Sequence, residues 1–152
     1  MEKIKVLFVL GEDGWDGSYS ETVWGEKISG GLIIDNIPFF KKKVCFEDVV
    51  EGELIAEKMY QYTKTIKKSA NSLYRVLFKS STQSQARSLL MKIEAGGCTY
   101  ETNRINDVYL VAINIPIAVD INGVWEIIDF GLKNDIWEVQ EGDDRHPKDI
   151  EQ

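Results

Sequence analysis

The residues of this chain that could do chemistry are mostly carboxylates, and the first group of them surrounds a tryptophan. Glu12, Asp13 and Asp16 flank Trp15 in a glycine-rich stretch that is typical of an exposed loop. Such carboxylates can pair with lysines or arginines of a partner, and an aromatic ring among polar groups is typical of a binding hot spot. We therefore predict a partner-binding surface made of Glu12, Asp13, Trp15, Asp16, Tyr19 and Glu21.

The same loop does not fit a calcium site. An EF-hand needs oxygen ligands at alternate positions, a glycine at the sixth position and a glutamate at the twelfth. Counted from Asp13, the third, sixth and twelfth positions hold Trp15, Ser18 and Trp24. We predict no metal site and no cofactor.

Signatures of catalysis are missing from the sequence. The single histidine, His146, lies in a charged segment that we expect to be too mobile and solvated to hold a catalytic base. Cys45 and Cys98 match no metal or redox spacing and are expected to be buried, reduced thiols. There is no nucleophile turn and no phosphate-binding loop. We predict no catalytic residue and no enzyme, although paired carboxylates leave acid–base chemistry open.

The charge of the chain is acidic and unevenly distributed. Eighteen basic and 25 acidic residues give a net charge of −7. Three acidic windows stand out: Glu12, Asp13, Asp16, Glu21 and Glu26; then Glu47, Asp48, Glu51, Glu53 and Glu57; then Asp135, Glu138, Glu141, Asp143 and Asp144. A nucleic-acid-binding protein would present a basic stripe instead, so nucleic acid is not an expected partner. Ordinary solvated surface and a surface that meets a cationic partner both remain open.

Neither export nor membrane insertion is predicted. The longest uncharged apolar runs, Val6–Leu10 and Val108–Ile113, are far shorter than the roughly 20 residues that span a bilayer. The apolar stretch at the N-terminus is also too short for a secretory signal. We expect a cytoplasmic protein that does not bind membranes.

Short strands are expected in the first half of the chain. Lys3–Leu10 and Tyr19–Lys27 alternate with a period of two, and Ser29–Gly31 would turn the second strand into Leu32–Asp35 as a hairpin. Further strands are expected at Val44–Phe46, Val49–Val50 and Leu54–Tyr62, the last of which would also suit a helix.

The block Ile33–Phe40 organises this half. Pro38 ends the strand pairing because it has no N–H, and Asp35 and Asn36 are expected to fix a bend. The predicted corner places Phe39 and Phe40 in a core.

The second half has a clearer order. Ser72–Phe78 alternates as a strand, and Thr82 with Gln85 forms a capping-box signature for a helix that ends at Gly96. The inward face of that helix is Ala86, Leu89, Leu90 and Ile93. Two strands then follow, at Cys98–Arg104 and Val108–Ile115.

A second helix is expected to be capped by Asp120 or Asn122. It would carry Val124, Ile127, Ile128 and Leu132 inward, and Ile136–Val139 would form the last strand. Three tryptophans in regular elements, Trp24, Trp125 and Trp137, are expected to be partly buried in the core.

These elements predict an α+β fold with two halves. The first half would be a small twisted β-sheet or partly closed barrel, and the second a ferredoxin-like (βαββαβ) half. The expected boundaries are 1–66 for the β-rich half, 67–142 for the ferredoxin-like half and 143–152 for a charged tail.

Four blocks of the chain carry a resemblance to a known family. The blocks are Glu21–Trp24, Ile34–Phe40, Asp48–Val50 and Asn71–Val76, and the Asp-Asn-Ile-Pro-Phe-Phe sequence within the second is the most specific. With these blocks the chain, from about Lys3 to Gly142, resembles a bacterial family catalogued as a domain of unknown function. Glu47 departs from the pattern, which favours glycine before Asp48. The resemblance implies a free-standing cytoplasmic protein with no assigned chemistry.

Two functional hypotheses follow. The first is a protein-binding module, specifically an immunity protein that neutralises a cognate basic toxin domain by stoichiometric binding, as some small acidic bacterial families do. The second is a domain that senses a small ligand, for which glycines such as Gly96 and Gly97 would matter more than the acidic windows. The oligomeric state is not predicted.

Overall fold

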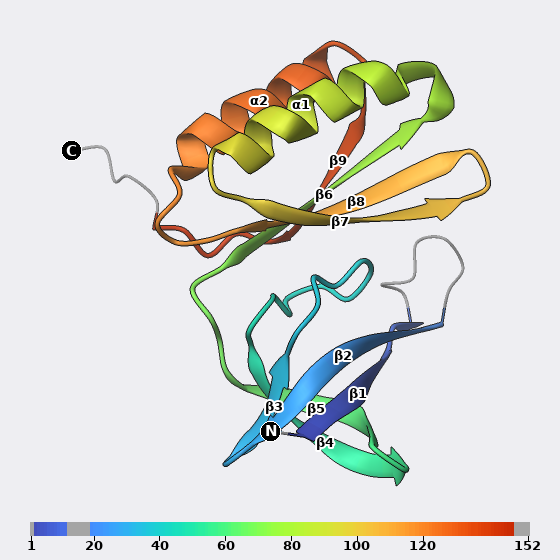
Figure 1. The fold of residues 1–152 in the computed structure, drawn as a ribbon, viewed down its shortest axis with the longest axis vertical. Coiled ribbons are helices and arrows are strands. Elements are labelled where there is room, and N and C mark those ends of the chain that lie inside the picture. Colours follow the sequence, from blue (N-terminus) through green and yellow to red (C-terminus); the bar gives the residue numbers. More distant parts are fainter. Residues whose placement is uncertain (1, 12–18, 148–152) are drawn as a thin grey trace. The chain divides into compact units, whose positions relative to one another are not determined.

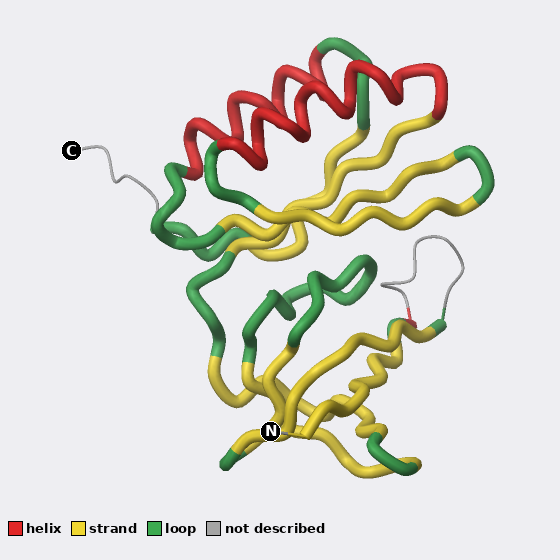
Figure 2. The backbone as a smooth tube through the Cα atoms, viewed as in Figure 1, coloured by secondary structure: helices red, strands yellow, loops and turns green. Residues whose placement is uncertain are grey.

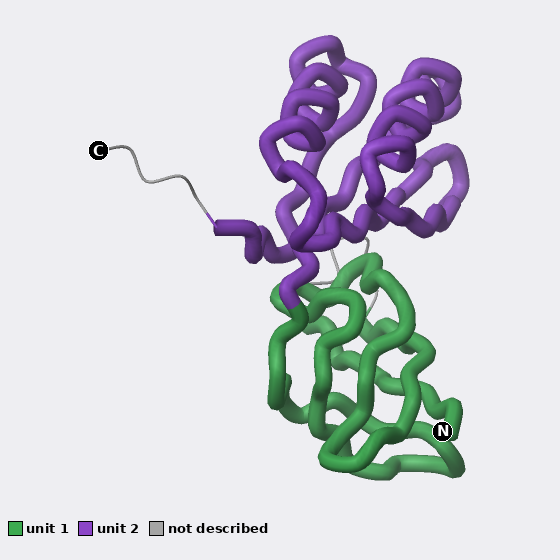
Figure 3. Tube along the Cα trace, turned by 60° about the vertical axis from the view of Figure 1, so that its left-hand side comes forward, with its two compact units in different colours: residues 1–69 green, residues 70–152 purple. Residues whose placement is uncertain are grey.

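The computed structural model describes residues 2–11 and 19–147 of the chain. The chain divides into two compact units, residues 1–69 and residues 70–152 (Figure 3).

Unit 1 is a closed β-barrel. Its described strands are β1 (Glu2–Val9), β2 (Ser20–Ile28), β3 (Gly31–Ile34), β4 (Val49–Ala56) and β5 (Met59–Lys67). Neighbouring strands are antiparallel except at the closure, where β1 pairs with β5 in parallel from Lys5↔Met59 to Leu7↔Gln61. The period-two pattern of β1 is confirmed, because Ile4, Val6 and Phe8 are buried while their neighbours are more exposed.

The β2–β3 hairpin is also confirmed. Gly30 has a φ of +93°, which L-amino acids with a side chain rarely adopt, and β2 pairs with β3 from Gly25↔Ile34 to Ile28↔Gly31. Two other expectations for unit 1 are wrong. Val44–Phe46 is a loop, and Leu54–Tyr62 is the tip of the β4–β5 hairpin, whose turn lies at Glu57 and Lys58.

The loop between β3 and β4 contains four buried apolar residues. Ile37, Phe40, Val44 and Cys45 are buried, whereas Phe39 is only half-buried. Asn36 Oδ1 accepts a hydrogen bond from Trp24 N at 2.6 Å, which ties the predicted bend to β2.

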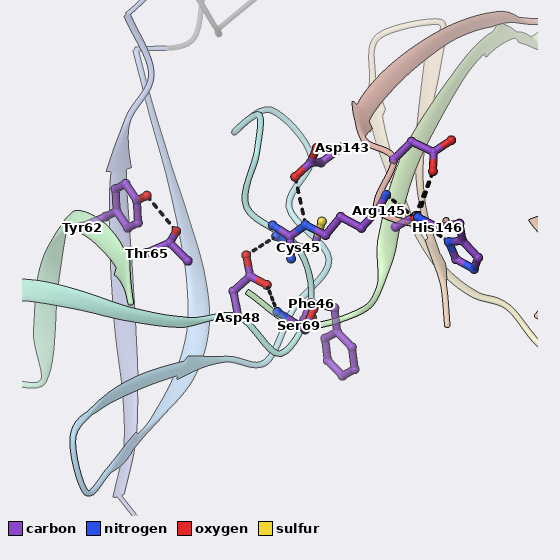
Figure 4. A network of polar contacts seen from close by, with 11 residues as sticks. Cys45, Phe46, Asp48, Tyr62, Thr65, Ser69, Asp143, Arg145 and His146 are labelled. Carbon is purple, nitrogen blue, oxygen red and sulfur yellow. Dashed lines mark hydrogen bonds and ion pairs between the residues drawn. The ribbon is translucent and has the colours of Figure 1, made fainter. Parts of the chain in front are cut away.

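Asp48 of the second acidic window is fully buried. Its carboxylate accepts hydrogen bonds from Cys45 N at 3.0 Å and Ser69 N at 2.8 Å, and Ser69 Oγ donates to Phe46 O (Figure 4). Glu47 has a φ of +69°, which explains why glycine suits that position.

Unit 2 is a four-stranded sheet with two helices on one face (Figures 1 and 2). Its described elements are β6 (Ser72–Lys79), a 3₁₀ turn (Ser80–Thr82), α1 (Gln83–Ala95), β7 (Thr99–Ile105), β8 (Val108–Ile115), α2 (Ile121–Lys133) and β9 (Glu138–Asp143). The sheet order is β7-β8-β6-β9, so β7 and β9 are its edges.

The helices cover the sheet with the faces that periodicity predicts. Ala86, Leu89, Leu90 and Ile93 of α1 and Val124 and Ile128 of α2 join one buried cluster with Tyr74, Val76 and Phe78 of β6. Leu132 is the exception, because it is 42% exposed.

One of the two predicted helix caps is present. Asp120 Oδ1 accepts a hydrogen bond from Asn122 N at 3.0 Å and so caps α2. The capping box at Thr82 is wrong. Thr82 makes no side-chain cap bond, because its hydroxyl donates to Ile136 O at 2.7 Å.

The expected fold class, α+β with a ferredoxin-like half, is wrong. The described chain is mostly β, with nine strands in two sheets and only two short α-helices of 13 residues each. The expectation assigned too few residues to strands. The barrel of unit 1 is closed and not partly closed, and the last strand extends to Asp143 and not only to Val139. Neither helix of the described residues has the length and apolar content needed to cross a membrane.

Candidate functional site

A cavity of about 590 Å³ lies in unit 2, beside α2 and β9. Its described lining is Tyr74, Ile121, Asn122, Trp125, Leu132, Val139, Glu141, Asp144 and Pro147. We call it the α2–β9 pocket. None of these lining residues is basic, whereas two carry carboxylates.

Two aromatic rings form part of the pocket wall. Trp125 projects from α2 and is 40% exposed, and its ring lies 5.8 Å from that of Tyr74, centroid to centroid, at an angle of 47°. Trp125 and Trp24 were both expected to be partly buried and are 40% and 42% exposed, whereas Trp137 is fully within the core. An exposed indole offers its π face to a ligand, and this face attracts cations.

Tyr74 joins the aromatic wall to the carboxylates. Its hydroxyl lies 2.8 Å from Asp144 Oδ2 and 3.3 Å from Glu141 Oε1, and it donates to this acidic pair. Burial, followed by the hydrogen bond and negative charge of Asp144, raises the pKa of the phenol far above its ordinary value. Tyr74 therefore stays protonated and acts as a donor, not as a base.

Asp144 is held in place by the chain that follows β9. Its Oδ1 accepts a hydrogen bond from His146 N at 3.1 Å, and Ser72 Oγ accepts from Arg145 N at 2.7 Å. The neighbouring Arg145 side chain pairs with Asp143 over 2.9 Å (Figure 4).

His146 also helps to fix the segment that follows β9. It is only 6% exposed, so the expectation of a mobile, solvated histidine is wrong. Its Nε2 lies 3.0 Å from Pro116 O, and because a carbonyl can only accept, Nε2 carries the proton. Nδ1 is then free to accept from Ser72 Oγ at 2.6 Å.

This Ser–His pair is structural. Ser72 is fully buried, and its oxygen already accepts from the backbone N–H groups of Arg145 and His146. A serine in that state has no access to a substrate, so the pair's effect is to fix Asp144 and Pro147 at the rim of the pocket.

Metal binding has no support in the described part of the chain, where no group of three or more His, Cys, Asp or Glu side chains has the arrangement of a metal site. The two cysteines are buried and form no disulfide, and burial raises the pKa of the Cys98 thiol to about 11. The pocket lining contains the rings of Tyr74 and Trp125 and the carboxylates of Glu141 and Asp144, and such groups can recognise a positive charge.

The residues predicted from the sequence lie elsewhere. Glu12, Asp13, Trp15 and Asp16 fall outside the described residues. Tyr19 is 81% exposed and directly precedes β2, so it is accessible to a partner.

Glu21, unlike Tyr19, is not at the surface. It is buried, with Oε2 accepting from Phe39 N at 2.6 Å and Oε1 accepting from Phe40 N at 3.0 Å and Lys41 N at 2.9 Å. Its carboxylate thus holds the loop between β3 and β4.

Sequence reasoning missed the α2–β9 pocket. Glu141 and Asp144 both belong to the third acidic window, so the charge pattern had already marked this part of the chain. Nothing local indicated that Tyr74, some 70 positions earlier, would lie beside them.

Of three comparisons with known proteins, one identifies a family and another shows a likeness of fold. The family model of DUF4265, described as a domain of unknown function, matches residues 21–139. No curated protein matches the chain. Among solved structures, the chain resembles the crystal structure of a hypothetical protein from Neisseria gonorrhoeae, with a TM-score of 0.69 and 20% identity, over 93% of this chain and 95% of that chain. At this identity the likeness concerns the fold.

Proposed function

The chain belongs to the DUF4265 family, whose description assigns no function, and we propose that it is a protein-binding module. In this proposal the α2–β9 pocket receives a basic side chain of a partner protein. Binding is stoichiometric, without turnover.

One observation carries the proposal: an aromatic wall and two carboxylates converge on a cavity whose described lining has no basic residue. A lysine or arginine side chain has the matching chemistry, because its apolar stem can pack on Trp125 while its charged end bonds to the carboxylates. A cation–π contact contributes about 0.5–2 kcal/mol and a charge-assisted hydrogen bond about 1.5–3 kcal/mol.

The specific form that we propose is an immunity protein that binds a basic toxin domain. The net charge of −7 supports it, because an acidic surface accelerates encounter with a basic partner and disfavours acidic ones. Tyr19 of unit 1, which is exposed, is proposed as a separate contact for a partner. Such a protein would act in the cytoplasm, where its two free thiols stay reduced.

The test is binding to a basic toxin domain encoded beside the gene, measured by calorimetry at low and physiological salt. We expect one-to-one binding that Glu141→Gln weakens about 10- to 100-fold, which is the loss expected for a charge-assisted contact. Trp125→Leu should weaken it as well. Glu94→Gln on α1 removes the same charge from an exposed site outside the pocket and should have little effect.

Two results would contradict this proposal. One is no binding to the neighbouring toxin domain even at low salt. The other is equal binding by the wild type and by both pocket variants.

The size of the cavity also supports a second candidate, a domain that senses a small cationic ligand. Pockets for small molecules usually measure about 300–1,000 Å³, and this one lies within that range. A thermal-shift screen with amines, amino acids and nucleotides separates the two candidates. A sensor would gain stability from a small amine alone, whereas an immunity protein would not.

A further inference from the structure

We infer that the partner's basic segment binds as an extended strand added to the edge strand β9, with one basic side chain in the α2–β9 pocket. This inference rests on the proposed function and specifies the form of the partner. Its support comes from the sheet order, the charge of β9 and the position of the pocket along that strand.

The strand β9 is an open edge. Within the described residues it pairs with β6 alone, from Leu73↔Asp143 to Leu77↔Glu138. Every second residue of an edge strand directs its backbone N–H and C=O away from the sheet, where another strand can pair with them.

The charge of β9 indicates which kind of strand can pair with its open edge. Two of its six residues, Glu138 and Glu141, are exposed and acidic, and none is basic. Asp143 is also acidic, but it is buried and paired with Arg145. A second copy of β9 would place like charges opposite one another, which is destabilising, whereas a basic strand forms favourable cross-strand pairs. The occupant is therefore a basic segment of another protein and not a second copy of this chain.

The other edge of the sheet lacks this selectivity. β7 carries Glu101 and Arg104, which have opposite charges. The cavity next to β7 has Arg87 in its described lining and no carboxylate. The positive charge of Arg87 and the lack of a carboxylate disfavour binding of a cation in this cavity.

The pocket lies on the same side of β9 as two alternate residues. Val139 and Glu141 are two positions apart, so both point to the helix-covered face of the sheet, and both line the pocket. Alternate side chains of an added strand would meet the same face. We therefore expect a basic residue opposite Glu141 and Asp144, and an apolar residue two positions away, near Val139 and Trp125.

The experiment uses the full chain and an eight-residue peptide that alternates valine and lysine, with capped ends. Calorimetry measures its affinity for the wild type and for Glu141→Gln, and amide hydrogen exchange measures protection of β9 and β7. Two N-methylated versions of the peptide, one methylated at odd and one at even positions, keep the charge and remove alternate backbone donors.

We expect the parent peptide to bind and Glu141→Gln to weaken it at least tenfold. One methylated version should lose at least tenfold in affinity while the other binds like the parent, because only one set of N–H groups faces β9. Exchange should slow in β9 and not in β7. A scrambled peptide with its four lysines in succession is the control for charge alone and should bind more weakly.

The two possible failures can be told apart. If both methylated peptides bind equally well and Glu141→Gln still weakens binding, strand addition is overturned. The proposed role of the pocket in binding a basic side chain is then still supported. Binding of the toxin domain that depends on the pocket, together with no binding of the parent peptide, would also overturn strand addition alone. Loss of all sensitivity to Glu141→Gln, for peptide and toxin domain, would overturn both proposals.

Discussion

The hydroxyl of Tyr74 lies 2.8 Å from Asp144 Oδ2 and donates a hydrogen bond to it. Tyr74 is the third residue of β6, and Asp144 directly follows β9. The bond has two consequences. It orients one carboxylate of the α2–β9 pocket before any partner arrives, and it keeps the phenol protonated. A site oriented in advance loses less conformational entropy when it binds.

The first prediction concerns Tyr74 and alkaline pH. Below pH 10 the phenol is protonated in both the folded and unfolded chain, so it adds no pH dependence. Above pH 10 the unfolded chain loses the proton, whereas the raised pKa of folded Tyr74 retains it. The free energy of unfolding should then fall with rising pH, by up to about 1.4 kcal/mol per pH unit from this group.

Urea denaturation of the wild type and of Tyr74→Phe at pH 8 and pH 11 measures this effect. The wild type should lose more stability between the two pH values than the variant does. Tyr19→Phe, at an exposed position, is the control and should behave like the wild type. Equal losses in the wild type and in Tyr74→Phe would contradict the prediction.

The second prediction concerns two glycines of α2 that should respond to alanine with opposite sign. A Cβ on Gly131 would collide with the indole of Trp137, whose Nε1 donates to Ile128 O at 2.9 Å. A Cβ on Gly123 would meet only Asp120 Oδ2, at 3.8 Å.

Gly131→Ala should therefore destabilise unit 2 by about 1–3 kcal/mol through overpacking. Gly123→Ala should stabilise it by about 0.5–1 kcal/mol through helix propensity. Thermal and urea unfolding of both variants provide the comparison. A stabilised Gly131→Ala would show that Trp137 does not pack over this glycine.

The third prediction assigns Glu21 a structural role in unit 1. Glu21→Gln keeps the shape of the side chain but places an NH₂ group against backbone donors, so at least one of three N–H groups loses its acceptor. The expected loss is about 1–3 kcal/mol. Glu53→Gln, at an exposed position of β4, removes the same charge and should change stability by less than about 0.5 kcal/mol. Matching urea midpoints for the two variants would refute this role.

The fourth prediction concerns thiol reactivity. Because the pKa of Cys98 is raised to about 11 by burial, the folded protein should hold almost no Cys98 thiolate at pH 8. Iodoacetamide should modify Cys98 slowly in the native protein and rapidly in urea, as read from peptide masses. Fast modification of Cys98 under native conditions would mean that this site opens readily.

Local features of the fold were predictable from the sequence because they depend on neighbours along the chain. The alternation in β1, the turn at Gly30, the cap at Asp120 and the inward face of α1 are confirmed for that reason. The errors have two different causes, one distant in the sequence and one local. The Thr82 capping box failed because Ile136 O competes for its hydroxyl, and the hairpin tip at Glu57 was mistaken for the middle of a strand.

The candidate site was predictable only in its charge. The third acidic window contained Glu141 and Asp144, which line the pocket, but the second window contained Asp48, which is fully buried. Charge density along a sequence does not tell an exposed carboxylate from one that accepts backbone N–H groups. Glu21 was misjudged as an exposed residue for the same reason.

By itself, the sequence determined the alternation of strands and helices, the apolar faces and the acidic charge, because each depends on residue type and on spacing of a few positions. Tertiary structure alone decided the parallel β1–β5 closure, the burial of Glu21 and His146, and the meeting of Tyr74 with Glu141 and Asp144. These contacts join residues 18 to 74 positions apart. Which partners meet over such separations depends on how the whole chain packs, and no local pattern records it.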